Sequence, residues 1–384
     1  MKKLNKERLY NTLKNRLDED MRWGRVGGAH LLVLQEGEEV CSICQGWHNP
    51  DTGEKLQEDA IYRLCSMTKP VTGVAALIAM ENGWFSPEDL VEAYLPDYAD
   101  MYVGKEENGR VVPDRKSNVP LRIWHMLSHC NGIMAEVPLG NMMVAATPYE
   151  IQTSLASITD YCAKQPLAFE PESYTAYTGR VSFDAVARII EMKSGMTYAQ
   201  FLKKYIFDPL GLKDFTYNPT DEQWDRMIVP TDKADGNGLV TVNMGKRTFE
   251  SLPLSYTSAG AGLVSSIRDY AVFAEMLRNK GRYGDVQIFQ PEHLEVMTKP
   301  RVPDDTPGRD PVSSWGLGVR VVVKDDVLPV GTFGWSGAYG THFWVDPVNQ
   351  ITAIYMRCSR WYDSHGCGTI GQQFEKDVMA CLEG

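Results

Sequence analysis

The chain has 384 residues and a formal net charge of −11, and 43% of its residues are hydrophobic and 23% charged. These proportions are typical of a globular protein, and the length is sufficient for one large domain or two closely linked ones. The negative charge argues against nucleic acid or an anionic membrane surface as a partner, because both bind clustered positive charge. We therefore expect no nucleic acid and no membrane among its partners.

The sequence contains no segment that predicts a membrane span or an export signal. The N-terminus leads into a charged amphipathic stretch, and the longest apolar run, 71–80, is far shorter than the roughly 20 residues that a helix needs to cross a bilayer. We therefore expect a cytoplasmic protein. In that compartment the cysteines are expected to be reduced and mostly buried, and Cys41 and Cys44 are interpreted as parts of a strand rather than as a zinc or redox motif.

The first predicted elements are a hairpin and a helix. Residues 29–34 and 38–47 alternate apolar and polar side chains around a turn at 35–38, which is typical of two paired strands. The apolar run at 71–80 predicts a buried helix that begins near Ser66. Residues 86–250 show mainly helical patterns, which are interrupted by predicted loops at 113–120 and 235–238.

Strands return in the last third of the chain. The patterns predict a helix at 266–280, strands at 316–323, 332–335, 340–345 and 351–357, and a final helix at 368–382. Strands at both ends of the chain and helices in the middle imply one shared, mostly antiparallel sheet, and thus an α+β fold. We assign residues 1–85 and 251–384 to an αβα sandwich and 86–250 to an inserted, mainly helical domain, with the active site in the cleft between them.

Ser66 and Lys69 place a hydroxyl and an amine one helical turn apart. A serine hydroxyl is a poor nucleophile at neutral pH and needs a nearby base and a field that favours negative charge. The start of the predicted helix supplies part of that field, and Lys69 supplies either the base or a fixed cation. A serine that opens a helix is usually only a cap, so the hypothesis of a catalytic serine depends on the rest of the sequence.

Two later segments support that hypothesis. The segment 169–179 contains Tyr177 and precedes a predicted helix. The segment 333–341 begins as a strand and continues into the small residues Ser336, Gly337 and Ala338, which allow a substrate to approach the strand edge closely.

With these segments the chain resembles the penicillin-recognising serine hydrolases of the class C β-lactamase type, and within them the family VIII carboxylesterases. The resemblance extends from Gly27 to about Arg357. It includes the segment 59–69, which leads into and contains Ser66 and Lys69, and it also includes the segments 90–96, 121–132, 205–212 and 260–277. It implies a β-lactamase/DD-peptidase-like fold.

The resemblance also implies roles for individual residues. Ser66 corresponds to the nucleophile, Lys69 to its partner and Tyr177 to the tyrosine of the family's Tyr-x-Asn motif. A tyrosine beside a cation can act as a phenolate base, so either Lys69 or Tyr177 is the general base. The backbone N–H groups of Ser66 and Ala338 correspond to an oxyanion hole.

The chain departs from the β-lactamases at two positions. Gly179 stands where Tyr-x-Asn has its asparagine, and Trp335-Ser336-Gly337 stands where β-lactamases have Lys-Thr-Gly. The missing amide and cation would hold the amide and carboxylate of a β-lactam, whereas Trp-x-Gly is similar to the esterase branch. We expect Trp335, Ser336, Gly337, Tyr339 and Gly179 to bind the substrate.

His125 and His129 stand four residues apart on a predicted helix, but no glutamate follows His125 as it does in zinc proteases. The resemblance makes His129 a hydrogen-bonding residue near the cleft, and we expect no metal and no cofactor. The aromatic residues of the C-terminal part are expected to be mostly core, with one or two lining an acyl pocket; they are Trp315, Tyr339, Trp344 and Trp361.

Taken together, these features predict a serine hydrolase that forms an acyl-enzyme on Ser66 and acts on small uncharged carboxylic esters. An amide is the other expected kind of substrate, because β-lactamase, D-aminopeptidase and DD-peptidase activities remain alternatives on the same fold. A catalytically silent binding protein is a further alternative. The presence of Ser66, Lys69 and Tyr177 argues against it, since a silent descendant has no reason to retain all three.

Overall fold

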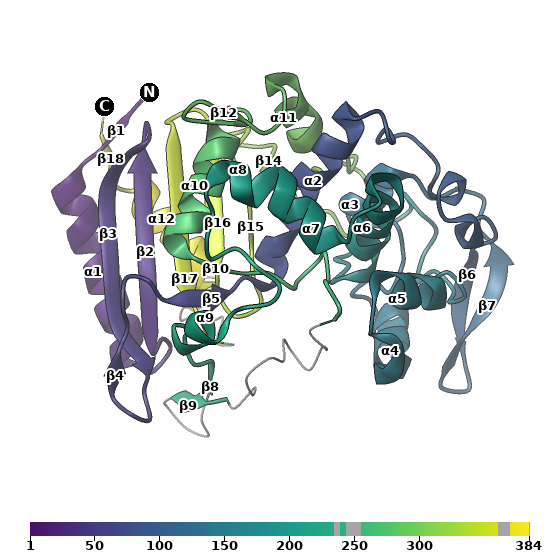
Figure 1. The fold of residues 1–384 in the computed structure, drawn as a ribbon, viewed down its shortest axis with the longest axis horizontal. Coiled ribbons are helices and arrows are strands. Elements are labelled where there is room, and N and C mark those ends of the chain that lie inside the picture. Colours follow the sequence, from purple (N-terminus) through teal and green to yellow (C-terminus); the bar gives the residue numbers. More distant parts are fainter. Residues whose placement is uncertain (234–238, 243–254, 360–368, 384) are drawn as a thin grey trace.

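The computed structural model describes residues 1–233, 239–242, 255–359 and 369–383 (Figure 1). Within these ranges the largest sheet has eight strands in the order β13-β14-β15-β16-β17-β2-β3-β4, and every neighbouring pair is antiparallel. The strands are β2 (Gly28–Gln35), β3 (Glu38–Asn49), β4 (Glu54–Lys55), β13 (Ser313–Trp315), β14 (Arg320–Val322), β15 (Phe333–Ser336), β16 (His342–Asp346) and β17 (Ile351–Arg357).

The remaining strands form two-stranded pairs. These pairs are β1 (Lys3–Leu4) with β18 (Leu382–Glu383), β5 (Ile61–Arg63) with β10 (Val264–Ser266), β6 (Tyr102–Glu107) with β7 (Arg110–Lys116), β8 (Thr231–Lys233) with β9 (Leu239–Thr241), and β11 (Arg282–Tyr283) with β12 (Val286–Gln287). The pairing of β1 with β18 brings the two ends of the chain side by side (Figure 1).

Helices cover both faces of the main sheet and form most of the region beside it (Figure 1). They are α1 (Lys6–Arg22), α2 (Lys69–Glu81), α3 (Ile123–Leu127), α4 (Pro138–Ala146), α5 (Leu155–Cys162), α6 (Val181–Ser194), α7 (Tyr198–Leu202), α8 (Asp208–Leu210), α9 (Asp221–Asp225), α10 (Ile267–Arg278), α11 (Pro291–Thr298) and α12 (Ile370–Met379). None of the helices in the described ranges is both long and apolar enough to cross a membrane.

Alternating side chains divide the core between the two faces of the sheet. On β17, Ala353 and Tyr355 pack with α1 and α12, whereas Ile354 and Met356 join the larger core that contains α2 and α10. All seven residues of β17 are buried, as expected for a strand covered on both faces. Val33 of β2 pairs with Ala353 of β17, so distant parts of the chain meet at the centre of the sheet.

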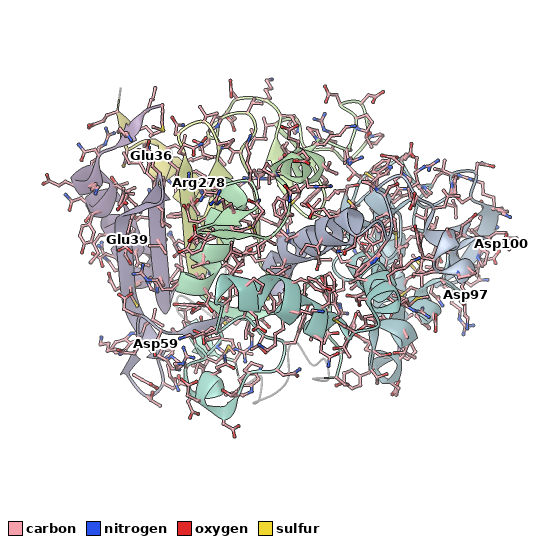
Figure 2. All side chains as sticks on the ribbon, turned by 45° about the horizontal axis from the view of Figure 1, so that its top comes forward. Glu36, Glu39, Asp59, Asp97, Asp100 and Arg278 are labelled. Atoms are coloured by element: carbon pink, nitrogen blue, oxygen red, sulfur yellow. The ribbon has the colours of Figure 1, made fainter. Side chains whose placement is uncertain are left out.

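This architecture confirms the predicted α+β fold, with helices on both faces of a mostly antiparallel sheet. The division into domains at residues 85 and 250 stays a prediction. Acidic side chains are exposed on and near the main sheet, at Glu36, Glu39 and Asp59, and in the helical region, at Asp97 and Asp100 (Figure 2).

Two of the predicted elements are wrong. The strand predicted at 316–323 is wrong in its first half: residues 316–319 are the turn between β13 and β14, where Gly318 has a left-handed conformation (φ +79°), and only β14 lies within the predicted range. The loop predicted at 113–120 begins inside β7. Proline is tolerated there because β7 is an edge strand of a two-stranded pair. The loop predicted at 235–238 lies outside the described residues.

Candidate active site

Ser66 lies in a 3₁₀ turn, Cys65–Thr68, that continues directly into α2. The prediction that Ser66 opens the helix is therefore refined, since the α-helix itself begins at Lys69. Cys65 has a φ of +47°, a left-handed conformation that is uncommon for residues other than glycine. The chain thus turns sharply between β5 and the 3₁₀ turn, and Ser66 remains half-buried while its neighbours are buried.

The amine of Lys69 is buried and has three polar neighbours. Its Nζ lies 3.2 Å from Ser66 Oγ, 2.6 Å from the carbonyl oxygen of Gly179 and 2.9 Å from that of Gly260. Burial lowers the pKa of Lys69 to about 7, although the charge of Asp184 acts in the opposite direction. A neutral amine donates two N–H groups to the two carbonyls and leaves its lone pair facing Ser66. The arrangement can therefore accept the serine proton.

Two segments of the chain approach closely to provide these carbonyls. A Cβ atom on Gly260 would lie 2.8 Å from the carbonyl oxygen of Gly179, so glycine is required at 260. Asp184 of α6 holds the Gly260 loop, because its carboxylate accepts hydrogen bonds from the Ala259 N–H (2.7 Å) and the Tyr256 hydroxyl. Gly260 and Asp184 were not among the predicted site residues. The available signal concerned Asp184 alone, a charged residue whose neighbours in the first two turns of α6 are mostly apolar.

The hydroxyl of Tyr177 lies between Ser66 and Trp335. It is hydrogen-bonded to the Ser66 side chain, and it accepts a hydrogen bond of 3.2 Å from Trp335 Nε1. Burial raises the pKa of Tyr177, and these two hydrogen bonds only partly offset the increase. Lys69 Nζ lies over the tyrosine ring, 4.7 Å from its centre, rather than beside the hydroxyl. These contacts favour a neutral phenol and make Lys69 the better base.

The turn after β15 packs against the chain just before Ser66. Gly337 N–H donates to the Thr341 carbonyl (2.7 Å), and the Thr341 hydroxyl donates to the Leu64 carbonyl (3.1 Å). A Cβ atom on Gly337 would lie 2.3 Å from that same Leu64 oxygen, so only glycine allows this approach. Ala338 follows in the turn and is exposed. Its part in an oxyanion hole stays a prediction.

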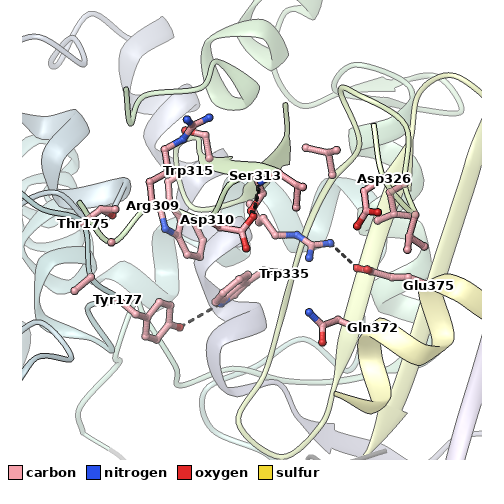
Figure 3. A pocket seen from close by; sticks show the side chains of 18 of the residues that line it. Thr175, Tyr177, Arg309, Asp310, Ser313, Trp315, Asp326, Trp335, Gln372 and Glu375 are labelled. Carbon is pink, nitrogen blue, oxygen red and sulfur yellow. Dashed lines mark hydrogen bonds and ion pairs between the residues drawn. The ribbon is translucent and has the colours of Figure 1, made fainter. Parts of the chain in front are cut away.

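A cavity of about 640 Å³ opens in front of Tyr177 and Trp335 (Figure 3). One wall is aromatic: the ring centres of Trp315 and Trp335 lie 4.4 Å apart, and those of Tyr177 and Trp335 lie 5.4 Å apart. The opposite end is polar and includes Glu375 and Gln372 of α12. Arg309 and Asp310 also line the cavity beside Trp315 (Figure 3), so the cavity combines an aromatic surface with charged groups at both ends.

Some of the residues predicted to bind the substrate border a cavity, and others are buried in the core. The prediction for Tyr339 is wrong, because its side chain is 0% exposed and packs in the core. Gly179 borders a second cavity of about 410 Å³, which Glu136 and Arg180 also line. Among the C-terminal aromatic residues, Trp315 lines the larger cavity, Trp344 is fully buried, and Trp361 lies outside the described residues.

His129 supports the segment that carries Tyr177. It has a φ of +62°, its Nδ1 accepts the Thr178 N–H (2.9 Å), and its ring centre lies 4.6 Å from that of Tyr177. Burial lowers the pKa of His129 well below its ordinary value, so the ring is neutral. His125 has different partners, the Arg122 N–H at 3.0 Å and Glu172 at 2.8 Å. The two histidines therefore do not form a joint metal site.

In the part of the chain that the structure describes, one group of side chains has the composition of a metal site: His30, Cys44 and Glu58. Burial raises the pKa of the Cys44 thiol to about 11, and the Arg268 guanidinium lies 3.7 Å from Glu58. A divalent cation would have to deprotonate the thiol and compete with this guanidinium, so the surroundings oppose metal binding. Cys41 packs on the opposite face of the sheet from Cys44 and contributes no ligand.

Comparison with known proteins identifies the class to which this fold and site belong. Residues 13–360 match the family described as Beta-lactamase, so the chain belongs to that family and is a serine hydrolase with the β-lactamase/penicillin-binding-protein fold. A protein of Escherichia coli (strain K12), whose name assigns it provisionally to the D-alanyl-D-alanine carboxypeptidases, is 26% identical over 354 residues, which are 85% of this chain and 77% of that protein.

Two solved structures share the fold. One is EstCE1, described as a hydrolase with promiscuous acyltransferase activity, with a TM-score of 0.79, 20% identity and coverage of 99% of both chains. The other is a penicillin-binding protein homologue from Caulobacter crescentus, with a TM-score of 0.73, 18% identity and coverage of 97% of this chain and 96% of that one.

Proposed function

We propose that the protein hydrolyses small uncharged carboxylic esters through an acyl-enzyme on Ser66. The observation that carries this proposal is the buried Lys69 amine, which two backbone carbonyls hold with its remaining hydrogen-bonding position toward Ser66. A desolvated amine with a pKa of about 7 is a competent base at neutral pH. The aromatic wall beside Tyr177 suits an apolar group of the substrate.

In the first half of the reaction, Ser66 Oγ attacks the ester carbonyl carbon while its proton passes to Lys69 Nζ. The N–H groups of Ser66 and Ala338 stabilise the negative oxygen of the tetrahedral intermediate, a contribution of about 3 kcal/mol for each donor. The C–O bond to the alcohol then breaks, and the departing alkoxide oxygen takes the proton that Lys69 accepted from Ser66, with the Tyr177 hydroxyl as the relay, which leaves Lys69 neutral again. Water repeats these steps on the acyl-enzyme, releases the carboxylic acid and restores Ser66.

The names of two related proteins point to different classes of substrate. The name of EstCE1 connects this fold with hydrolase and acyltransferase chemistry. The name of the Escherichia coli relative connects it with peptides that end in D-alanine, whose free carboxylate needs a partner in the site. Trp335 occupies the position of the lysine in the β-lactamase motif, so this chain lacks that lysine. Arg309 and Arg320 line the cavity, but they are already paired with Asp304 and Glu375. We therefore favour esters over β-lactams and D-alanyl peptides.

The proposal predicts a clear preference between neutral and anionic substrates. We expect kcat/KM for p-nitrophenyl acetate or butyrate to exceed kcat/KM for nitrocefin by about tenfold or more, because an unpaired carboxylate in the site costs at least 1–3 kcal/mol. Trp335→Lys should narrow this difference by restoring a cation beside Tyr177. A nitrocefin value equal to the ester value would contradict the esterase proposal, and failure of a fluorophosphonate to label Ser66 would favour a silent binding protein.

The proposal also predicts the pH dependence of the reaction. Lys69 acts in its neutral form, so kcat/KM for the ester should rise with pH and level off above about pH 7, with roughly a tenfold loss per unit on the acidic side. The charge of Asp184 raises the pKa of Lys69, so Asp184→Asn should move this acidic limb to lower pH. A limb that is absent, or that moves to higher pH in Asp184→Asn, would contradict the role of Lys69 as base.

A further inference from the structure

Thr72 lies on α2 one turn after Lys69 and binds the residue that precedes Gly260. The Thr72 hydroxyl donates to the Ala259 carbonyl (2.6 Å), whereas the Lys69 amine donates to the Gly260 carbonyl (2.9 Å). Residues three positions apart lie on the same face of a helix, so two neighbouring side chains of α2 hold two consecutive carbonyls of one loop. Thr72 and Ala259 are both fully buried, so bulk water does not compete for their hydrogen bond.

The direction of each hydrogen bond in this row follows from the groups involved. A carbonyl oxygen can only accept, so Thr72 uses the one hydrogen of its hydroxyl on Ala259. The Tyr198 hydroxyl of α7 lies 2.8 Å from Thr72 Oγ1 and must therefore donate to it. Burial raises the pKa of Tyr198, so the phenol keeps the proton that it donates. Tyr198 thus directs the Thr72 hydroxyl toward Ala259.

The Gly260 carbonyl needs such anchors because it belongs to a glycine. The close approach to Gly179 excludes a Cβ atom at position 260, but a glycine backbone is also the least restricted in its rotation. Ala259 is instead held through both of its polar backbone groups, since its N–H donates to Asp184 (2.7 Å) and its carbonyl accepts from Thr72. The peptide unit between Ala259 and Gly260 is planar, so these contacts fix its orientation and leave only two torsion angles before the Gly260 carbonyl.

We propose that Thr72 is a positioning residue, which holds the Gly260 carbonyl against the Lys69 amine and so maintains the orientation of the base. Tyr198 contributes by directing the Thr72 hydroxyl. The inference rests on the proposed function, because it concerns the base of the same reaction. Without this hydroxyl the Gly260 carbonyl can turn away, and the amine then loses one of the two acceptors that direct its lone pair toward Ser66. A carbonyl stabilises the ammonium form more than the neutral amine, so its loss also lowers the pKa of Lys69.

The test begins with Thr72→Val, which replaces the hydroxyl with a methyl group of similar size. We expect kcat/KM for p-nitrophenyl acetate on the plateau above pH 7 to fall about tenfold, the value of one hydrogen bond. The acidic limb of the pH profile should move about one unit to lower pH. Thr72→Ser retains the hydroxyl and should restore both the plateau and the limb. Tyr198→Phe should move the limb in the same direction by a smaller amount.

A shift of the limb in Thr72→Val would report on hydrogen bonding, because the substitution changes no charge. The titratable and charged groups that face Lys69 in the described part of the chain all remain in this variant; they are Asp184, Glu136, Cys65, Arg180, Tyr177 and His129. A purely structural loss would lower the unfolding temperature and leave the limb in place. If Thr72→Val does not fold, Tyr198→Phe provides the same test and leaves the hydrogen bond from Thr72 to Ala259 available.

A limb that stays at its wild-type position in Thr72→Val or in Tyr198→Phe, or an equal change in Thr72→Ser, would overturn the inference. A second measurement does not require ester hydrolysis: NMR of protein labelled with ¹³C at lysine Cε should show a lower pKa for Lys69 in both variants than in the wild type. The Lys69 signal is identified by its loss in Lys69→Met. An unchanged pKa would overturn the inference as well. Absence of any ester hydrolysis would instead refute the proposed function and leave this titration intact.

Discussion

Replacing Ser66 with alanine is expected to lower kcat/KM for p-nitrophenyl acetate by about a thousandfold or more, because no acyl-enzyme can form without the hydroxyl. The fold should change little. Ser66 is only half-buried, and the Lys69 amine retains its hydrogen bonds to the carbonyls of Gly179 and Gly260. The measurement is steady-state hydrolysis by highly purified protein, together with the unfolding temperature of both forms.

A matched control is Ser173→Ala, which removes the hydroxyl of an exposed serine in the segment that carries Tyr177. Its hydroxyl donates a hydrogen bond to the carbonyl of Glu170, which lies outside the site, so activity should be retained. If Ser66→Ala keeps more than a few per cent of wild-type turnover while Ser173→Ala is normal, the nucleophile lies elsewhere.

Lys69 and Tyr177 are expected to behave as one unit that transfers the serine proton. Lys69→Met and Tyr177→Phe should each lower kcat/KM by about a hundredfold or more, the usual contribution of a positioned acid or base. The double variant should lose little more than the worse single variant, because either change already interrupts the same proton path. A double-mutant cycle on the ester substrate measures this coupling.

Lys69→Met retains the length of the side chain but leaves the carbonyls of Gly179 and Gly260 without their buried donor. We therefore also expect a loss of about 1–3 kcal/mol in the free energy of unfolding, which urea unfolding would measure. Kinetic constants must be compared at temperatures where both variants are folded. A double variant that shows the full sum of two independent losses, or a fully active Tyr177→Phe, would separate the two residues.

The strands were predictable where burial alone determines them. The apolar run of β17 was predicted at 351–357, its observed bounds, because every residue of a strand covered on both faces is apolar or packed. The hairpin of β13 and β14 was not predictable in the same way. Its turn lies between apolar residues, and a Cβ atom on Gly318 would lie 2.6 Å from the Lys69 carbonyl oxygen, a contact that only the fold creates.

The residues of the site also differ in how far the sequence could predict them, because some act through a side chain and others through the backbone. Ser66 and Lys69 could be proposed from the sequence because their chemistry lies in their side chains and their spacing is visible, whereas Tyr177 was proposed only from the resemblance to the family. The contribution of Gly260 was not, because every residue has a carbonyl and only the fold brings this one to Lys69. The burial of Tyr339 likewise depends on the turn that follows β15 rather than on its position in a motif.

The contact between the Thr341 hydroxyl and the Leu64 carbonyl joins residues that are 277 positions apart. During synthesis, the segment around Ser66 therefore emerges long before the turn that packs against it. At roughly 10 residues per second, the delay is about half a minute. For that time β2 also lacks its neighbour β17, so its apolar edge is available to chaperones or to other chains. A nascent chain thus carries its predicted nucleophile without the surroundings that would activate it, and hydrolysis can begin only when almost the whole chain has been made.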